Sequence, residues 1–130
     1  MSETPVEVKY KISDETLAEI NNRLVNEKLS FNVGNIELSK FKGIYAIWWS
    51  HKCLYVGKSD ERTVHKRLSE HLANCHNQEL RDWIEAKNGL LKVSFVNLEA
   101  NKEAIKYIHE IEAVLIKLLS PELNKTNKRN

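Results

Sequence analysis

Glycine, proline, cysteine and long apolar runs are all scarce in this chain of 130 residues. Its two cysteines, Cys53 and Cys75, are too few to form a disulfide framework. The longest apolar run, residues 44–49, is much too short to cross a bilayer. Residues 1–10 also lack the basic and apolar regions of a secretory signal. These absences predict a reduced, cytoplasmic protein that does not interact with a membrane.

The charge is nearly balanced over the whole chain but is unevenly distributed along it. The formal net charge is only +2, which does not by itself identify a nucleic-acid partner. Residues 1–40 contain five basic and seven acidic side chains, whereas residues 41–130 contain fifteen and eleven. The positive potential is therefore expected on the part of the protein that follows residue 40.

The spacing of apolar residues predicts one α/β domain (α+β) with a small mixed or antiparallel three-stranded sheet flanked by helices. Helical spacing, capping residues and chain breakers predict helices over 13–29, 60–74, 77–88 and 101–119. Alternating and β-branched runs predict strands at 43–49, 53–57 and 90–98. We divide the chain into an N-terminal helical extension and lead-in (1–40), a main domain (41–124) and a polar C-terminal tail (125–130).

The first predicted helix is acidic and has an apolar stripe that must be covered. An acidic helix is a poor contact for a polyanion. We therefore expect it to lie away from any nucleic-acid cleft, packed either on the back of the sheet or on a second subunit.

One carboxylate lies on an apolar helix face. At about 100° per residue, Glu112 falls inside the stripe of the last predicted helix, whereas Glu110 falls on its polar side. The stripe consists of Ile105, Ile108, Leu115, Ile116 and Leu119. A desolvated carboxylate must be paired, hydrogen-bonded or bound to a metal. Glu112 is therefore either one partner of a structural salt bridge, a residue that reaches water when the helix rolls, or a metal ligand.

Arg67 and His71 are four residues apart and share one face of their predicted helix. A guanidinium and an imidazole that project together suit a phosphate site. An ordinary solvated helix edge would carry the same two residues, so this pair leaves both interpretations open.

Two of the four glycines flank one hairpin, in Gly43-Ile44-Tyr45 and Tyr55-Val56-Gly57. Together with Arg67, His71, Glu112 and Asn124 in the same order, these tripeptides resemble the GIY-YIG nuclease family over residues 43–124. The resemblance implies that the two strands pair and bring both tyrosines to one concave face. It also implies a phosphodiesterase site whose catalytic residues are Tyr45, Tyr55, Arg67, His71, Glu112 and Asn124.

The resemblance assigns a role to each of these residues. Glu112 is expected to bind one Mg²⁺ (or Mn²⁺), Arg67 to bind the scissile phosphate, and Tyr45 to position or deprotonate the attacking water. Help for Tyr45 is expected from Tyr55, His71 or Lys58, and Asn124 is expected to order the site. Additional substrate contacts are expected from Gly57, Lys58, Arg62, Lys66 and His76. Arg62 is also the alternative to Arg67 as the phosphate ligand, because the segment between Gly57 and Arg67 is long.

These features predict a metal-dependent endonuclease, a phosphodiester hydrolase whose partner is DNA, with RNA as an open alternative. A non-catalytic nucleic-acid-binding module and a domain that recruits another protein remain alternatives. We expect specificity to come from a targeting partner protein, from a homodimer or from the structure of the DNA. Two short pairs of possible zinc ligands also occur, His51 with Cys53 and Cys75 with His76. A structural zinc site on these four residues is the weaker hypothesis, because no Cys-x-x-Cys pattern occurs.

Overall fold

The computed structural model describes residues 12–124. The predicted C-terminal tail, residues 125–130, lies outside the described residues, as do the first eleven residues. No helix in the described part is long and apolar enough to cross a membrane.

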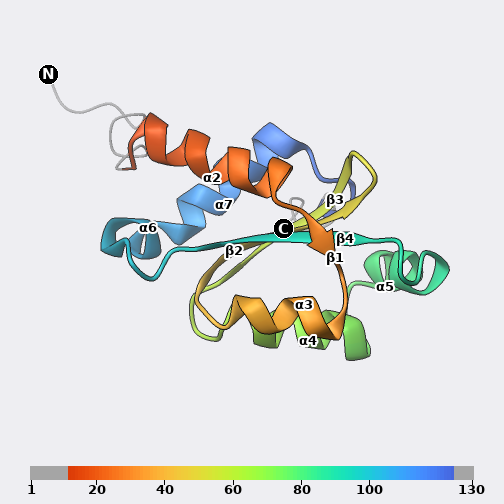
Figure 1. Ribbon diagram of the computed structural model, residues 1–130. Helices are drawn as coiled ribbons and strands as arrows, with labels where there is room; N and C mark the ends of the chain where they lie inside the picture. The colour runs from red at the N-terminus through yellow and green to blue at the C-terminus, as the bar shows by residue number, and fades with distance from the viewer. Residues whose placement is uncertain (1–11, 125–130) are drawn as a thin grey trace, which may run out of the picture.

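A four-stranded antiparallel sheet forms the centre of the protein, with strand order β1-β4-β2-β3 (Figure 1). The strands are β1 (Leu29–Ser30), β2 (Gly43–Trp49), β3 (Lys52–Ser59) and β4 (Lys92–Asn97). The predicted hairpin and third strand are present, and all pairs are antiparallel. The sheet has four strands where three were predicted. The additional strand, β1, has only two residues, too few to show an alternating pattern.

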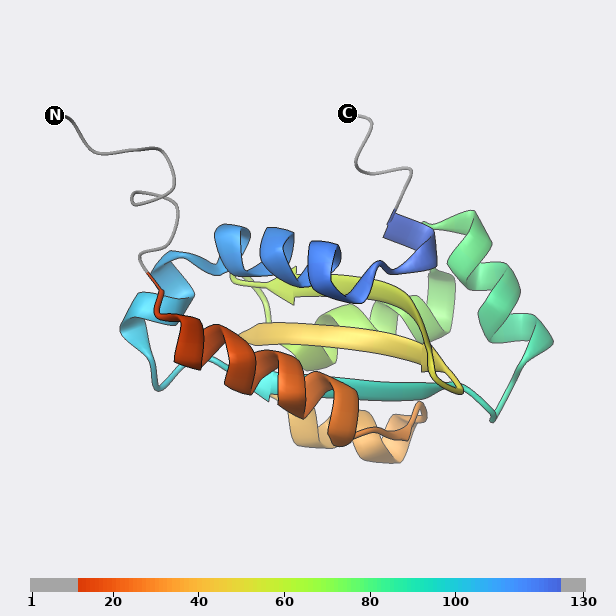
Figure 2. The same cartoon turned by 90° about the horizontal axis from the view of Figure 1, so that it is seen from above.

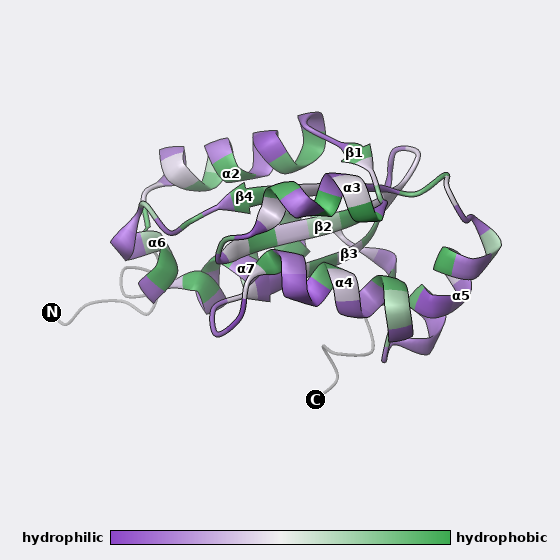
Figure 3. Cartoon of the chain, turned by 60° about the horizontal axis from the view of Figure 1, so that its bottom comes forward, coloured by the Kyte–Doolittle hydropathy of each residue, from purple (hydrophilic) through white to green (hydrophobic). Residues whose placement is uncertain are grey.

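Helices cover both faces of this sheet, as Figures 1 and 2 show. The elements on one face are α2 (Asp14–Asn26), α6 (Lys102–Lys106) and α7 (Ile108–Leu119). Those on the other face are α3 (Val33–Ile36), η1 (Glu37–Ser39), α4 (Val64–Asn74) and α5 (Gln78–Ala86). A short 3₁₀ helix, η2 (Glu122–Asn124), follows α7 and lies against β3. Hydrophobic and hydrophilic residues alternate along α2 and α4, as expected for helices with one buried side (Figure 3).

The period of two along each strand divides the core into two clusters. Ile44, Ala46 and Trp48 of β2 pack with α2 and α7, whereas Tyr45 and Ile47 pack with α4 and α5. We call these the α2/α7 core and the α4/α5 core. The α2/α7 core includes Leu17, Ile20 and Leu24, the buried residues of α2. The acidic helix was predicted to pack either on the sheet of its own chain or on a second subunit. In the structure, α2 packs on the sheet of its own chain.

The caps of several helices agree with the sequence. The side chains of Ser13, Thr63 and Asn77 accept hydrogen bonds from backbone N–H groups in the first turns of α2, α4 and α5. The predicted helix over 101–119 is wrong in one respect, because it is broken at Tyr107 into α6 and α7. No proline or glycine marks this break, so periodicity could not predict it. After the break, Ile111 becomes part of the buried stripe.

Candidate active site

The two hairpin glycines allow close approaches that a side chain would prevent. A Cβ on Gly43 would lie 2.0 Å from the carbonyl oxygen of Val96 on the neighbouring β4. A Cβ on Gly57 would lie 2.4 Å from the hydroxyl oxygen of Tyr45, its partner on β2. Gly57, predicted to contact substrate, thus makes the space that the Tyr45 ring occupies.

Three rings meet over this hairpin. The ring centroid of Tyr45 lies 6.3 Å from that of Tyr55 and 5.8 Å from that of His71, and the Tyr55 and His71 centroids are 5.5 Å apart. The Tyr45 hydroxyl oxygen is 2.9 Å from His71 Nε2. Tyr45 is fully buried, whereas Tyr55 is half-buried and lines a pocket. The expectation of both tyrosines on one face is therefore met, but at different depths.

Helix α4 presents Arg67 and His71 one turn apart on the side that faces the tyrosines. The Arg67 guanidinium lies near the Tyr45 hydroxyl, and its charge opposes the rise of the Tyr45 pKa. A guanidinium can only donate, so Arg67 offers the Tyr45 hydroxyl no acceptor. The Arg67 Nε–H is buried and has no hydrogen-bond partner in the part of the chain that the structure describes.

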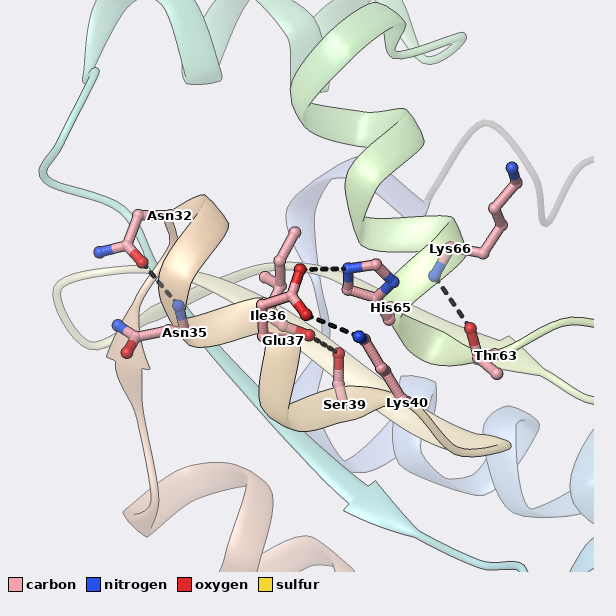
Figure 4. Close-up of polar contacts among 9 residues, drawn as sticks. All are labelled: Asn32, Asn35, Ile36, Glu37, Ser39, Lys40, Thr63, His65 and Lys66. Atoms are coloured by element: carbon pink, nitrogen blue, oxygen red, sulfur yellow. Dashed lines mark hydrogen bonds and ion pairs between the residues drawn. The ribbon is translucent and has the colours of Figure 1, made fainter.

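The lead-in segment holds the start of α4 in place (Figure 4). Glu37 of η1 accepts from Lys40 Nζ at 2.7 Å and faces His65 Nε2 of α4 at 3.2 Å. The Val64 N–H donates to the Phe41 carbonyl at 2.7 Å. Part of the predicted N-terminal extension therefore supports the helix that carries Arg67 and His71.

Burial sets the protonation of the two central groups. Desolvation, followed by the charge of Arg67, lowers the pKa of His71 to about 4, so its imidazole is neutral at pH 7. Desolvation raises the pKa of the Tyr45 hydroxyl far above its ordinary value, and Tyr55 adds to this effect. At neutral pH the pair is thus a protonated tyrosine beside an unprotonated histidine.

Glu112 of α7 is half-buried at the border of the apolar stripe, while Glu110 is exposed. Desolvation raises the pKa of the Glu112 carboxyl, and nearby Lys58 acts in the opposite direction. Among the described residues, no hydrogen bond or ion pair engages this carboxylate. The salt bridge considered from the sequence is therefore absent from the described contacts.

Asn124 is buried against β3, on the side of that strand that has no strand neighbour. Its Oδ1 accepts from the Val56 N–H at 2.8 Å, and its Nδ2 donates to the Val56 carbonyl at 3.0 Å. Val56 lies between Tyr55 and Gly57, so Asn124 fixes the backbone under the ring cluster.

Two pockets adjoin at Arg67, which lines both of them. The larger, of about 540 Å³, contains Tyr55, His71 and His76 together with the start of α5. The smaller, of about 260 Å³, contains Lys58 and Arg62. None of the described residues of α2 lines either pocket, which agrees with the predicted position of the acidic helix.

The remaining predicted contacts lie at the margins of this region. Lys66 is exposed on α4 and lines neither of these two pockets. Arg62 forms an ion pair with Glu70, whereas Arg67 points to the tyrosines. Of the two alternatives for the phosphate ligand, Arg67 is the one within the ring cluster.

Comparison with known proteins identifies the family of the chain. A family model described as the GIY-YIG catalytic domain matches residues 41–129. The chain belongs to the GIY-YIG family. No curated protein and no solved structure matches the chain significantly. The match to the GIY-YIG domain includes every residue of the proposed site, from Tyr45 to Asn124.

The described residues of the GIY-YIG domain form no zinc site of the kind considered from the sequence. Cys53 belongs to the α2/α7 core and Cys75 to the α4/α5 core, so the sheet separates them. Among the described residues, no group of three or more histidine, cysteine or acidic side chains could bind a metal ion together.

Sequence reasoning missed Cys75 as a member of the site. Its Sγ lies 3.2 Å from His71 Nδ1, one helical turn after the histidine. The spacing of four residues was visible in the sequence, but Cys75 ends α4 and its direction could not be predicted from there. His109 and Asp60, which flank Glu112 and face each other at 3.7 Å, were also missed.

Proposed function

We propose that this GIY-YIG domain is a metal-dependent endonuclease that hydrolyses phosphodiester bonds in DNA. The main support is the Arg67 side chain, which borders both pockets with a buried Nε–H that has no partner among the described residues. Leaving a buried donor unpaired costs about 1–3 kcal/mol. A phosphate oxygen in the pocket would satisfy this donor through a charge-assisted hydrogen bond.

In this proposal, Tyr45 and His71 handle the proton of the attacking water. The Tyr45 side chain is fully buried in the described structure, with the Arg67 guanidinium near its hydroxyl oxygen. When Arg67 turns to a phosphate, that oxygen can accept a hydrogen bond from water. Tyr45 can pass its own proton to His71, whose Nε2 is 2.9 Å away and whose imidazole is neutral at pH 7.

Tyr55 is the second candidate for the group that touches the water. It is half-buried and lines the larger pocket, whereas Tyr45 lies beneath it with no exposed surface. Tyr55 would contact the water without any movement of Arg67. Substituting each tyrosine with phenylalanine separates the two assignments.

Glu112 fits the role of a single ligand to Mg²⁺ or Mn²⁺. It is a half-buried carboxylate without a hydrogen bond or ion pair to any described residue, and hard cations prefer oxygen ligands. A single protein ligand suits an ion that keeps most of its waters, and it does not suit a closed zinc site. When bound, the ion would offset negative charge that develops on the phosphate oxygens.

Lys58 supports an anionic substrate in the same region. It lines the smaller pocket with Arg62 and Arg67, and the positive charge of the chain lies in residues 41–130. Double-stranded DNA presents a dense row of phosphates to such a surface. RNA presents the same charge, so substrate comparison has to decide between the two.

A nicking assay on supercoiled plasmid tests the proposal. We expect nicked product with Mg²⁺ and none with EDTA. Arg67→Ala should lose cleavage while retaining most DNA binding, because affinity is spread over several lysines. The slope of binding affinity against salt concentration for Arg67→Ala should decrease by the equivalent of roughly one phosphate contact.

Arg62→Ala is the matched control for Arg67→Ala, since Arg62 lies in the same pocket but is paired with Glu70. It should cleave close to the wild-type rate. DNA binding without cleavage under all metal conditions would instead support a non-catalytic nucleic-acid-binding module on this fold.

A further inference from the structure

The chain of contacts at the ring cluster continues past His71 to a second buried group. Tyr45 Oη lies 2.9 Å from His71 Nε2, and His71 Nδ1 lies 3.2 Å from the Cys75 Sγ. Cys75 is 2% exposed and borders the larger pocket. Tyr45 and Cys75 thus contact different nitrogens of the same imidazole.

The hydrogen-bond capacity of Tyr45 determines which His71 nitrogen carries the proton. Among the described residues, His71 is at hydrogen-bonding distance from the Tyr45 hydroxyl, and the Arg67 guanidinium lies near it. Arg67 can only donate, so the Tyr45 O–H has His71 Nε2 as its one acceptor there. If Nε2 carried the proton, a fully buried O–H would remain unpaired, at a cost of about 1–3 kcal/mol.

The neutral imidazole must then carry its proton on Nδ1. That N–H needs its own acceptor, and the Cys75 sulfur is the atom at hydrogen-bonding distance. Burial raises the pKa of the Cys75 thiol, so the acceptor is the neutral sulfur. A thiol is a weak donor, and leaving its S–H unpaired costs little compared with an unpaired phenol.

We propose that Cys75 is a positioning residue that holds His71 in the Nδ1–H tautomer, with Nε2 free to accept the proton of Tyr45. The tautomer follows from the contacts alone, whereas its effect on cleavage rests on the proposed nuclease function. After His71 takes the proton, both ring nitrogens donate, and Cys75 still accepts from Nδ1. The Cys75 sulfur thus accepts a hydrogen bond from Nδ1 of both the neutral and the protonated imidazole.

Two-bond ¹H–¹⁵N NMR spectra of the metal-free protein without DNA test the tautomer directly. Wild-type His71, assigned by comparison with His71→Gln, should show a protonated Nδ1 and an unprotonated Nε2 at pH 7. An Nε2–H tautomer in the wild-type protein would overturn the proposal. This measurement does not depend on cleavage, so it tests the tautomer even if the protein proves not to be a nuclease.

Two Cys75 variants test the positioning role. Cys75→Ala removes the acceptor and should move His71 toward the Nε2–H tautomer, while Cys75→Ser keeps an acceptor and should retain Nδ1–H. In the nicking assay, Cys75→Ala should lower kcat by on the order of tenfold to 100-fold with little change in KM, the loss seen when a metal-bound histidine loses the partner of its second nitrogen. Cys75→Ser should restore most of that rate.

Cys53→Ala is the matched control, because Cys53 is the other buried cysteine and lies in the α2/α7 core. It should leave the His71 spectrum and the per-molecule cleavage rate unchanged. A Cys75→Ala protein that keeps both the Nδ1–H tautomer and the wild-type kcat would contradict the positioning role. Equal loss of kcat in folded Cys75→Ala and Cys75→Ser proteins would contradict it as well.

Discussion

The two cores on either side of the sheet are built from alternate residues of the same strands but contain different chemistry. In the α2/α7 core, β2 contributes Ile44, Ala46 and Trp48, and the indole N–H of Trp48 is satisfied by Ser94 at 2.9 Å. In the α4/α5 core, the same strand buries Tyr45 against His71. Packing defects beneath α2 should therefore reduce stability alone, whereas defects in the α4/α5 core should also displace reactive groups.

Loss of the Glu112 charge should have the largest effect on activity. Glu112→Gln should abolish cleavage, because it removes the proposed metal ligand, and DNA binding should persist. The melting temperature should stay level or rise, since burial raises the pKa of this carboxyl and thereby disfavours the charged form in the folded state. Glu110→Gln, on the exposed side of α7, is the control and should behave as wild type. Wild-type cleavage by Glu112→Gln would refute the metal assignment.

Removing the Tyr45 hydroxyl tests the polar chain of the α4/α5 core. Tyr45→Phe keeps the ring above Gly57 and should slow cleavage by about 10²-fold or more, as expected for a general base or its aligner. Tyr55→Phe should cause a smaller loss if Tyr55 only supports Tyr45. A larger loss with Tyr55→Phe would show that the tyrosine lining the pocket is the one that contacts the water. Single-turnover rates at pH 6–9 provide the measurement.

A pair of leucine substitutions compares the two cores directly. Leu24 on α2 and Leu68 on α4 are both 0% exposed, in opposite cores. Each change to alanine should destabilise the fold by about 2–5 kcal/mol in urea unfolding. Only Leu68→Ala, next to Arg67, should also slow cleavage per folded molecule. A similar rate loss with Leu24→Ala would mean that the α2/α7 core also positions the site.

The buried histidine predicts a smaller effect on the pH dependence of stability. The pKa of His71 is lowered to about 4 in the folded protein, so the unfolded chain binds its proton at higher pH. The contribution of His71 to stability is thus present above about pH 6.5 and is lost as the pH falls toward 4, by on the order of 3 kcal/mol. His71→Gln should show a smaller loss between pH 7 and pH 4.5 in urea unfolding. His51→Gln, at an exposed position, should keep the wild-type dependence.

The sequence predicted the parts of the fold that have a long hydrophobic period. The hairpin, the strand near residue 95 and the helices α2, α4 and α5 have enough apolar repeats to show their type. The lead-in was harder, because β1, α3 and η1 each span four residues or fewer. Their stability comes from contacts with β4 and α4 rather than from local preference.

The site was predicted as a set of residues but not as an arrangement. Motif order indicated Tyr45, Arg67 and His71, and the structure brings these three into contact. The depth of Tyr45 beneath Tyr55 could not be predicted, since both residues sit in similar apolar runs. Cys75 was missed because a single cysteine at a helix end has no periodic signal.

The contact between Asn124 and Val56 also affects how this protein behaves at high concentration. β3 is the outermost strand of the sheet, and an uncovered edge is a template for pairing with another chain. Asn124 occupies both the N–H and the carbonyl of Val56, much as a neighbouring strand residue would. The 3₁₀ helix that carries Asn124 lies along the same strand. The C-terminal part of the described chain therefore acts as a cover on the sheet edge, which protects the protein against edge-to-edge aggregation.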